Sequence, residues 1–225
     1  MIKLKYENLV FDEHKLPDFV ATMNTYHYGK KIILKDKYAS GDYKLLEFAN
    51  GFYAYVSNYI LREDFELELS VAREDYLALH INQIQAGAEC KISLNGETLA
   101  YDDKVITSIF LTAPSDSFVL SGSSGACVNR LKIVIPKKWL FQQIPSFNPA
   151  LLDSYLQLDQ ERLSMDAIDP TYRSMVDKVM NTEDSLFYLP VAQNVVALIA
   201  ERFFNRLATK LQKKQKGNEW SDRVA

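Results

Sequence analysis

Apolar and polar residues alternate in short runs along the first part of the chain. The segment "FELELSV" (65–71) shows the pattern most clearly. Its apolar positions are Phe65, Leu67, Leu69 and Val71, and its polar positions are Glu66, Glu68 and Ser70. A repeat of two is typical of a strand with one buried face. Similar runs, rich in β-branched and aromatic residues, are "GFYAYVSNYIL", "DYLALHINQI", "CKISLNGETLAY", "VITSIFLTA", "SFVLSG" and "NRLKIVIP".

Turn residues separate these runs. Asn95 and Gly96 lie between "CKISL" and "ETLAY", and Asn-Gly favours a two-residue hairpin because both positions of a type I′ turn need positive φ. "APSDS" (113–117) and "GSSG" (122–125) mark further breaks. Many short strands at close spacing indicate a barrel or sandwich. We therefore predict a β-barrel over residues 40–136.

A helical pattern replaces the strands after about residue 140. Asn148-Pro149 and Asp169-Pro170 each place a capping side chain before a proline, the arrangement that starts a helix. "PALLDSYLQL" and "PTYRSMVDKVM" follow with helical spacing. We divide the chain into a β-barrel domain, residues 1–140, and a helical subdomain, residues 141–225.

One long amphipathic helix is predicted over residues 190–214. Pro190 suits a first turn, and no glycine or proline follows until Gly217, where Gly217 and Asn218 indicate a stop. Its apolar stripe consists of Val195, Leu198, Ile199, Phe203, Leu207 and Leu211. The stripe either packs on the barrel of its own chain or contacts a second copy. We expect it to help form a homodimer, the commonest oligomer.

Composition and charge exclude several classes. The net charge of −3 gives no support to nucleic-acid binding by the chain as a whole. Cys90 and Cys127 lie far apart in the sequence and form neither a zinc motif nor a disulfide framework. The N-terminus has no signal-peptide core, and no apolar run reaches the roughly 20 residues of a membrane span. We expect a cytoplasmic protein with no membrane contact.

His80 is the most suggestive titratable residue, because it lies in the middle of the strand-like segment "YLALHINQI". Metal-binding cupin barrels carry an HxH pair on a strand, whereas this segment reads "HIN". The other histidines, His14 and His27, precede the predicted barrel, so the three ligands of a catalytic metal site are not evident. "SGSSGAC" lacks nucleophile-elbow spacing, and no nucleotide-binding motif is present. We predict no catalytic residues, no metal and no cofactor, with His80 as a structural or cavity-lining residue.

The tyrosines give a second candidate feature. Small β-barrels either fill their interior with side chains or hold one small ligand, and both interpretations remain open for this chain. If a ligand site exists, we expect it in the barrel interior. The candidate lining residues mix polar tips with strand positions opposite the apolar faces: Tyr53, Tyr55, Tyr76, His80 and Asn82.

Three segments together resemble the N-terminal regulatory part of AraC-type transcriptional regulators, of the kind common in Bacteroidetes. They are "GFYAYVSNYILREDFELELSVAREDYLALHINQI", "SIFLTAPSDSFVLSGSSGACVNRLKIVIPKKWL" and "FYLPVAQNVVALIAERFFNRLATKL". The resemblance spans most of the chain through loose patterns. It implies a mainly β fold, a cupin-like double-stranded β-helix that senses a small molecule, followed by helices that dimerise.

The same resemblance implies a C-terminal region with two helix-turn-helix units. The chain ends at "GNEWSDRVA", where that region would begin, so we expect DNA contact only through a domain that this chain lacks. The functional prediction is a ligand-sensing, dimerising domain of an AraC-type regulator, and not an enzyme. The alternatives are a metal-free or metal-dependent cupin enzyme, a sugar-binding cupin without a transcriptional role, and a structural module with a filled barrel.

Overall fold

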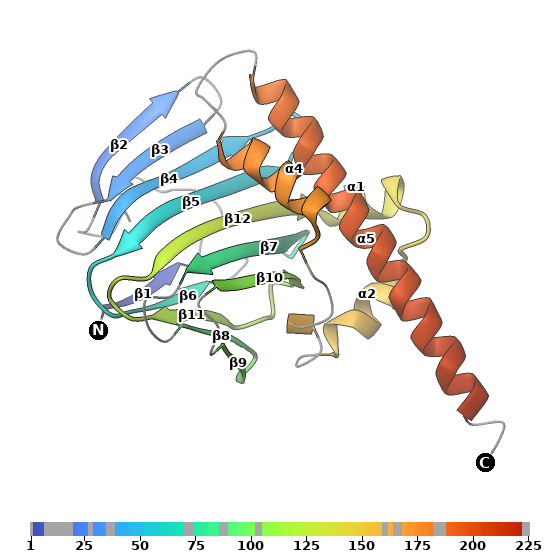
Figure 1. The fold of residues 1–225 in the computed structure, drawn as a ribbon. Helices are drawn as coiled ribbons and strands as arrows, with labels where there is room; N and C mark the ends of the chain where they lie inside the picture. The colour runs from blue at the N-terminus through green and yellow to red at the C-terminus, as the bar shows by residue number, and fades with distance from the viewer. Residues whose placement is uncertain are drawn as a thin grey trace.

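The computed structural model describes residues 2–6, 20–26, 29–34, 39–69, 74–85, 90–101, 105–158, 162–163, 168–181 and 188–221. Strands come first and helices last, as Figure 1 shows. The strands are β1 (Ile2–Tyr6), β2 (Val20–Tyr26), β3 (Gly29–Leu34), β4 (Ala39–Glu47), β5 (Tyr53–Leu61), β6 (Phe65–Leu69), β7 (Tyr76–Gln85), β8 (Cys90–Leu94), β9 (Glu97–Tyr101), β10 (Val105–Thr112), β11 (Phe118–Gly122) and β12 (Cys127–Pro136). The helices are α1 (Lys137–Gln143), α2 (Pro149–Leu156), α4 (Pro170–Met180) and α5 (Tyr188–Ser221).

Strands β5 to β12 form a double-sheet jelly roll. The order β5-β12-β7-β10 lies within a seven-stranded sheet, and the order β6-β11-β8-β9 lies within a five-stranded sheet. The chain therefore alternates between the two sheets, except at the β8–β9 hairpin. This nesting of two Greek keys is the arrangement found in cupins. The predicted fold class, a cupin-like β-barrel followed by helices, is confirmed. "FELEL" of the predicted strand "FELELSV" forms β6, and "LKIVIP" forms the end of β12. Ser70 and Val71 lie outside the described residues.

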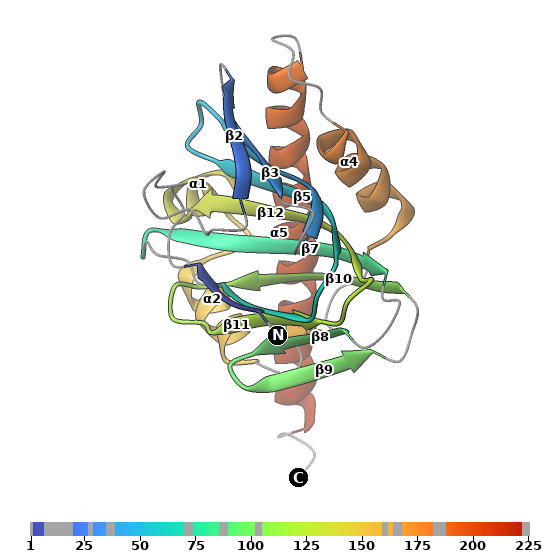
Figure 2. The same ribbon diagram turned by 90° about the vertical axis from the view of Figure 1, so that its left-hand side faces the viewer.

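The sheets begin earlier in the chain than the predicted residue 40. β2, β3 and β4 extend the larger sheet beyond β5 (Figure 2). β1 pairs in parallel with β6 at the edge of the smaller sheet. The sequence "GKKIIL" of β3 carries two lysines, which dilute the apolar signal used to find strands. Lysine is common on strands near a sheet edge, where it discourages pairing with other chains.

The Asn95-Gly96 hairpin is confirmed and also anchors a later segment. Asn95 has φ 51° and Gly96 φ 87°, the left-handed values that a type I′ turn needs. The Asn95 side chain donates to Asp116 Oδ1 at 2.8 Å. Asp116 accepts two further hydrogen bonds of 2.9 Å from the buried guanidinium of Arg162. The segment after α2 is thereby fastened to the turns at one end of the jelly roll.

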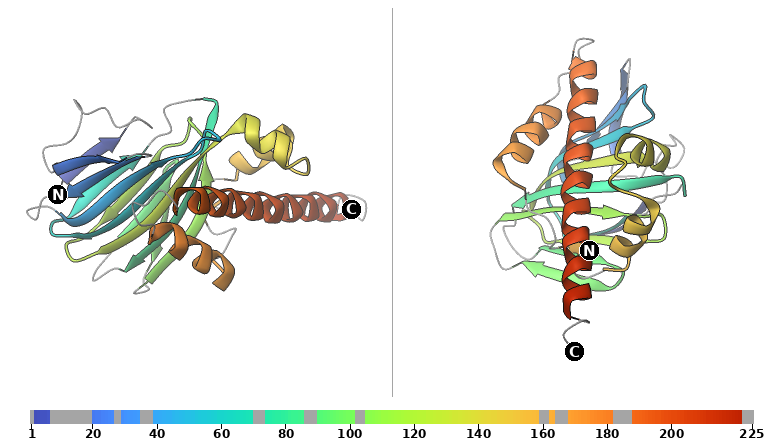
Figure 3. Two further views of the ribbon diagram at one scale, coloured as in Figure 1. Left: turned by 90° about the horizontal axis from the view of Figure 1, so that it is seen from above. Right: turned by 90° about the vertical axis from the view of Figure 1, so that its right-hand side faces the viewer.

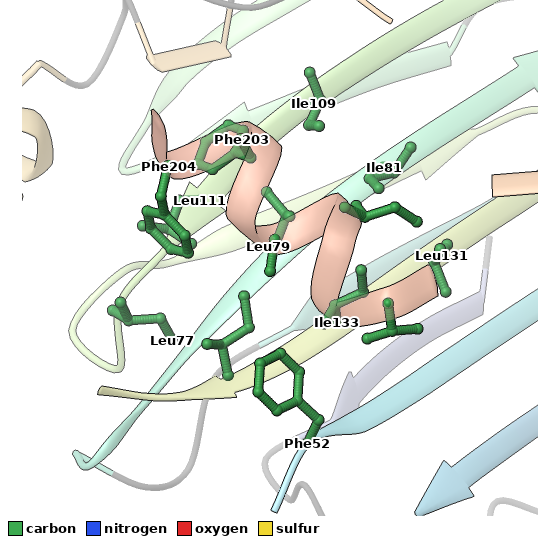
Figure 4. Close-up of a cluster of buried hydrophobic side chains, with 14 of the residues drawn as sticks. Phe52, Leu77, Leu79, Ile81, Ile109, Leu111, Leu131, Ile133, Phe203 and Phe204 are labelled. Atoms are coloured by element: carbon green, nitrogen blue, oxygen red, sulfur yellow. The ribbon is translucent and has the colours of Figure 1, made fainter. Parts of the chain in front are cut away.

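The helices cover the outer face of the larger sheet, on the side away from the smaller sheet (Figure 1). In Figure 4, Phe203 and Phe204 of α5 lie against side chains of the sheet. The labelled sheet-side residues of this cluster are Phe52, Leu77, Leu79, Ile81, Ile109, Leu111, Leu131 and Ile133. Sheet and helices thus share one hydrophobic core. The division into domains at residue 140 stays a prediction, although the strands do end at Pro136.

The predicted caps are confirmed, and the last helix is longer than predicted. The Asn148 side chain accepts from the Leu151 N–H at 3.0 Å at the start of α2. α5 is one continuous helix, but it runs through Gly217 to Ser221, so the predicted stop was wrong. A glycine inside a helix costs only about 1 kcal/mol. α5 crosses the sheet and projects beyond it (Figure 3). No helix in the described part of the chain combines the length and the hydrophobicity of a membrane span.

Asp169 joins α4 to α5. Its carboxylate accepts from the Tyr172 N–H at 2.9 Å and caps α4. It also accepts from Arg202 and from Arg206 of α5, each at 2.8 Å. Both guanidinium groups lie 5.3 Å from the centre of the Tyr172 ring. The hydrogen bond from Arg202 is the largest cause that lowers the pKa of Asp169 to about 2.

We predict that the ion pairs of Asp169 with Arg202 and Arg206 stop stabilising the fold in acid. Because the folded-state pKa lies below the ordinary value of 3.8, the stabilisation is complete above pH 5 and is lost as the pH falls towards 2. Asp169→Asn keeps a capping side chain and removes the charge. In urea unfolding at pH 6, the free energy of unfolding of wild type should exceed that of the variant by up to about 1 kcal/mol. This difference should disappear at pH 2. An equal gap at both pH values would contradict the ion-pair explanation.

Candidate functional site

The candidate site is the inner face of the larger sheet, which faces the smaller sheet. Two neighbouring rows of side chains cross this face over strands β4, β5, β12, β7 and β10. The first row is Tyr43, Ser57, Arg130, Asn82 and Ser108, and the second is Leu45, Tyr55, Lys132, His80 and Phe110. Strand alternation sends the intervening residues, such as Leu131 and Ile133, to the helix side. The polar side chains are thus enclosed between the two sheets.

The smaller sheet gives this interior an apolar opposite wall. Ile92 and Leu94 of β8 and Phe118 and Leu120 of β11 are all buried. The centre of the Phe118 ring lies 4.8 Å from that of His80 and 5.2 Å from that of Phe110. Any molecule held between the sheets would therefore meet polar groups on one side and apolar groups on the other.

His80 is a neutral, fully hydrogen-bonded imidazole. Arg130 Nη2 donates to His80 Nδ1 at 2.7 Å, so the ring proton lies on Nε2. Nε2 donates to Thr112 Oγ1 at 2.8 Å, and that hydroxyl donates to the Ala78 carbonyl. Burial, and then the charges of Arg130 and Lys132, hold the pKa of His80 well below 6.5. With both ring nitrogens engaged, His80 orients Arg130 and offers no lone pair to a metal.

Arg130 is a buried cation. Its side chain comes from the central strand β12, and the residue is 2% exposed. Its guanidinium carbon lies 5.3 Å from the centre of the Phe118 ring. Its Nε has no hydrogen-bond partner among the residues that the structure describes. Burial lowers the pKa of Arg130, but a guanidinium keeps its proton inside proteins.

Lys132 is a second buried cation, two residues along the same strand. The residue is 6% exposed, and Nζ lies 4.9 Å from the centre of the Tyr55 ring. Burial, followed by the charge of Arg130, lowers the pKa of Lys132 to about 7. In the described part of the chain no carboxylate forms an ion pair with Arg130 or Lys132. Charges buried without a counter-charge cost several kcal/mol each.

The structure brings the five residues predicted to line a ligand site onto this one face. Tyr55, Tyr76, His80 and Asn82 are buried, and Tyr53 is half-buried. The ring centres of Tyr53 and Tyr76 lie 6.3 Å apart. Their role in binding a ligand stays a prediction.

Sequence reasoning missed Arg130 and Lys132. The signal was present in "CVNRLKIVIP", where the two cations alternate with Leu131 and Ile133. Such alternation normally indicates a solvent-facing polar side. Here the strand is central in its sheet and covered on both faces, so the polar side is also buried.

A separate cavity of about 180 Å³ lies on the other face of the larger sheet, beside α4. Asn58, Gln83 and Asn129 line it from the sheet, and Arg173 and Asp177 line it from α4. Arg173 and Asp177 are exposed, so this hollow does not bury a charge. Among the described residues, no group of three or more His, Cys, Asp or Glu side chains could hold a metal ion.

The solved structures compared with the chain below share 14% or less of its sequence. No protein-family model and no curated protein matches the chain. A cupin protein from Bacteroides fragilis has a TM-score of 0.28 and 14% identity, over 38% of this chain and 65% of that one. The match thus spans slightly less than two thirds of the length of the B. fragilis protein. The Schizosaccharomyces pombe Cnp3 cupin domain has a TM-score of 0.32 and 9% identity, over 51% and 82%. A predicted oxalate decarboxylase from Thermotoga maritima has a TM-score of 0.28 and 10% identity, over 51% and 99%. Similarity at this level gives no argument about function, so the function has to be inferred from the residues of the candidate site.

We predict that Lys132 destabilises the free protein. Because its folded-state pKa of about 7 lies below its ordinary 10.5, the unfolded chain binds the proton more tightly, and wild-type stability should rise from pH 7 to pH 10. Lys132→Met keeps most of the side-chain volume and removes the charge. Its gain in free energy of unfolding, on the order of a few kcal/mol, should be largest at pH 7 and shrink by pH 9.5. Urea unfolding at the two pH values measures this, and a variant less stable than wild type at pH 7 contradicts it.

Proposed function

We propose that this chain is the small-molecule-binding and dimerising part of a transcription regulator similar to the AraC type. The binding half of the proposal is carried by one observation. Arg130 and Lys132 are buried between the sheets without an acidic partner among the described residues. Replacing uncompensated buried charges by apolar residues usually stabilises a protein. Costly groups of this kind are typical of functional sites, where stability is given up for binding.

The surroundings of the two cations favour binding over catalysis. His80 is held neutral by burial and by both cations, so it does not change protonation near pH 7. No acidic side chain among the described residues of the two inner rows stands beside it as a general acid or base. What the interior offers is a set of donors, acceptors and rings in fixed positions, which suits recognition of a ligand.

The regulatory half of the proposal is supported by the sequence resemblance and by the layout of the helices. α5 packs on the outer face of the same sheet whose inner face carries the cations. Leu131 and Ile133 contact the helix side, while Arg130 and Lys132 lie on the interior side of the same strand. A ligand that shifts β12 would therefore also move the side chains on which α5 packs.

The dimerising surface needs revision from the predicted stripe. Ile199, Phe203, Leu207 and Leu211 lie in the chain's own core and are at most 4% exposed, because they cover the sheet and α2. Leu198 is 53% exposed, and Val195 is partly exposed. Val191, 49% exposed, lies on the same face of α5 as these two. We propose that these three residues, and not the buried four, contact a second copy.

The dimer surface is testable with one matched pair of variants. Leu198→Glu places a charge on the exposed face and should shift sedimentation equilibrium from dimer to monomer with unchanged thermal stability. Phe203→Ala, five residues further along α5, removes a core ring and should cost about 3–5 kcal/mol of unfolding free energy. A wild type that is monomeric at high micromolar concentration rules out dimerisation through α5.

Ligand binding is tested by the amide NMR spectrum of the wild-type protein. A library of neutral sugars, amino acids, carboxylic acids and phosphate esters is added compound by compound. At least one compound should shift the amide signals of residues in β5, β7 and β12 and leave those of exposed α4 residues unchanged. If no compound shifts the interior signals, the interior is a filled core and the proposed function is wrong.

A further inference from the structure

We infer that the jelly-roll interior binds a small organic anion, whose carboxylate or phosphate lies between Arg130 and Lys132 and whose O–H or N–H donor reaches Asn82. This inference deepens the proposed function and rests on it. It assigns the chemical class of the ligand from groups in the two inner rows that the fold leaves unsatisfied.

The first step is the pairing of two cations. Arg130 and Lys132 are two residues apart on one strand, so their side chains leave the same face with a Cα separation of roughly 6.6 Å. After burial, the charge of Arg130 is the second cause that lowers the pKa of Lys132. An anion between them would replace this repulsion by attraction to both. Guanidinium and ammonium groups together are a common way to hold carboxylates and phosphates.

The second step is donor capacity. Of the hydrogen-bond donors on Arg130, Nη2 is used by His80, and Nε has no partner in the part of the chain that the structure describes. Lys132 forms a contact with the Tyr55 ring, and no hydrogen bond or ion pair from its Nζ is found among the described residues. The hydrogen bond to His80 fixes the guanidinium plane. The two cations therefore present oriented donors that only an acceptor-rich group can satisfy.

The third step is a neighbouring acceptor. Asn82 lies directly opposite Arg130 across the β12–β7 pair and is fully buried. Its Nδ2 donates to Ser108 Oγ at 3.0 Å, which leaves Oδ1 pointing elsewhere, with no partner among the described residues. A buried acceptor without a donor costs about 1–3 kcal/mol. A ligand that carries a hydroxyl or amino group beside its anionic group would satisfy Oδ1 and both cations together.

The fourth step is the pH dependence that follows. Lys132 is faced by His80 from β7 and by Tyr55 from β5, with Arg130 beside it and Tyr43 one strand further. Burial raises the pKa of both tyrosines and lowers that of His80, so all three stay neutral between pH 6 and 9. Lys132 is then the group on this face that titrates in that range, with a pKa of about 7 in the free protein. An anion needs its protonated form, so affinity should fall above pH 7.

The experiment uses three matched probes on the whole chain at constant ionic strength. L-lactate carries a carboxylate and a hydroxyl, propionate lacks the hydroxyl, and lactamide lacks the charge. Inorganic phosphate is the fourth probe and distinguishes a phosphate ligand from a carboxylate ligand. Binding is followed by titration of the amide NMR signals of β7 and β12 at pH 6.5, 7.5 and 8.5.

We expect lactate or phosphate to bind and lactamide not to bind. Lys132→Met should weaken anion binding at least tenfold, whereas Lys138→Met, which removes an exposed lysine on α1, should leave it unchanged. Asn82→Leu should remove the preference for lactate over propionate. Above pH 7, wild-type affinity for lactate, whose own charge is constant over this range, should fall, approaching about tenfold per pH unit. The pH series needs no variant, so it remains decisive if a substitution prevents folding.

Three results would contradict the inference, and they can be told apart. If a neutral sugar from the library binds inside while lactate and phosphate do not, the anion class is wrong and the proposed binding function stands. If nothing binds inside and anion affinity is absent at every pH, the inference and the proposed function fail together. Equal binding of lactate and lactamide also contradicts the role of the two cations.

Discussion

The whole arrangement depends on one strand that is buried on both faces. β12 lies between β5 and β7 in the larger sheet, with helices over one side and the smaller sheet over the other. Its apolar residues, Leu131 and Ile133, supply the core beneath α5. Its cations, Arg130 and Lys132, lie on the interior side and are only 2% and 6% exposed. On a surface strand the polar side chains of the alternating pattern meet water. In this jelly roll they are buried, so they need partners inside the protein.

Much of the fold was predictable because it follows from local rules. The Asn95-Gly96 turn, the Asn148 cap and the alternation in "FELELSV" each specify their element with few residues. The missing early strand "GKKIIL" shows the limit, since lysines near a sheet edge hide the pattern. The long α5 was predictable from its uninterrupted stripe, but what covers that stripe was not. From the sequence, Phe203 and Leu207 could pack equally well against a second copy or against their own sheet. The tertiary structure places them in the core of their own chain.

The candidate site was half predictable. Alternation opposite Leu77, Leu79 and Ile81 correctly placed His80 and Asn82 on the other face of their strand. The same rule places Arg130 and Lys132 opposite Leu131 and Ile133, but charged residues on a strand ordinarily face solvent, so the sequence alone did not single them out. Which side of a strand meets water is decided by the second sheet, which is remote in sequence. Histidine attracted attention for its chemistry, yet its role here is to orient an arginine.

The central claim is that Lys132 is a buried cation without a counter-charge in the free protein. The most direct measurement is a pH titration of the Lys132 Nζ and Cε NMR signals in the ligand-free protein, assigned by comparison with Lys132→Met. The account predicts a midpoint near 7, because burial and then the charge of Arg130 lower the pKa of Lys132. A midpoint near the ordinary 10.5 would show that the ammonium reaches water or a carboxylate, and the interior would then be no anion site.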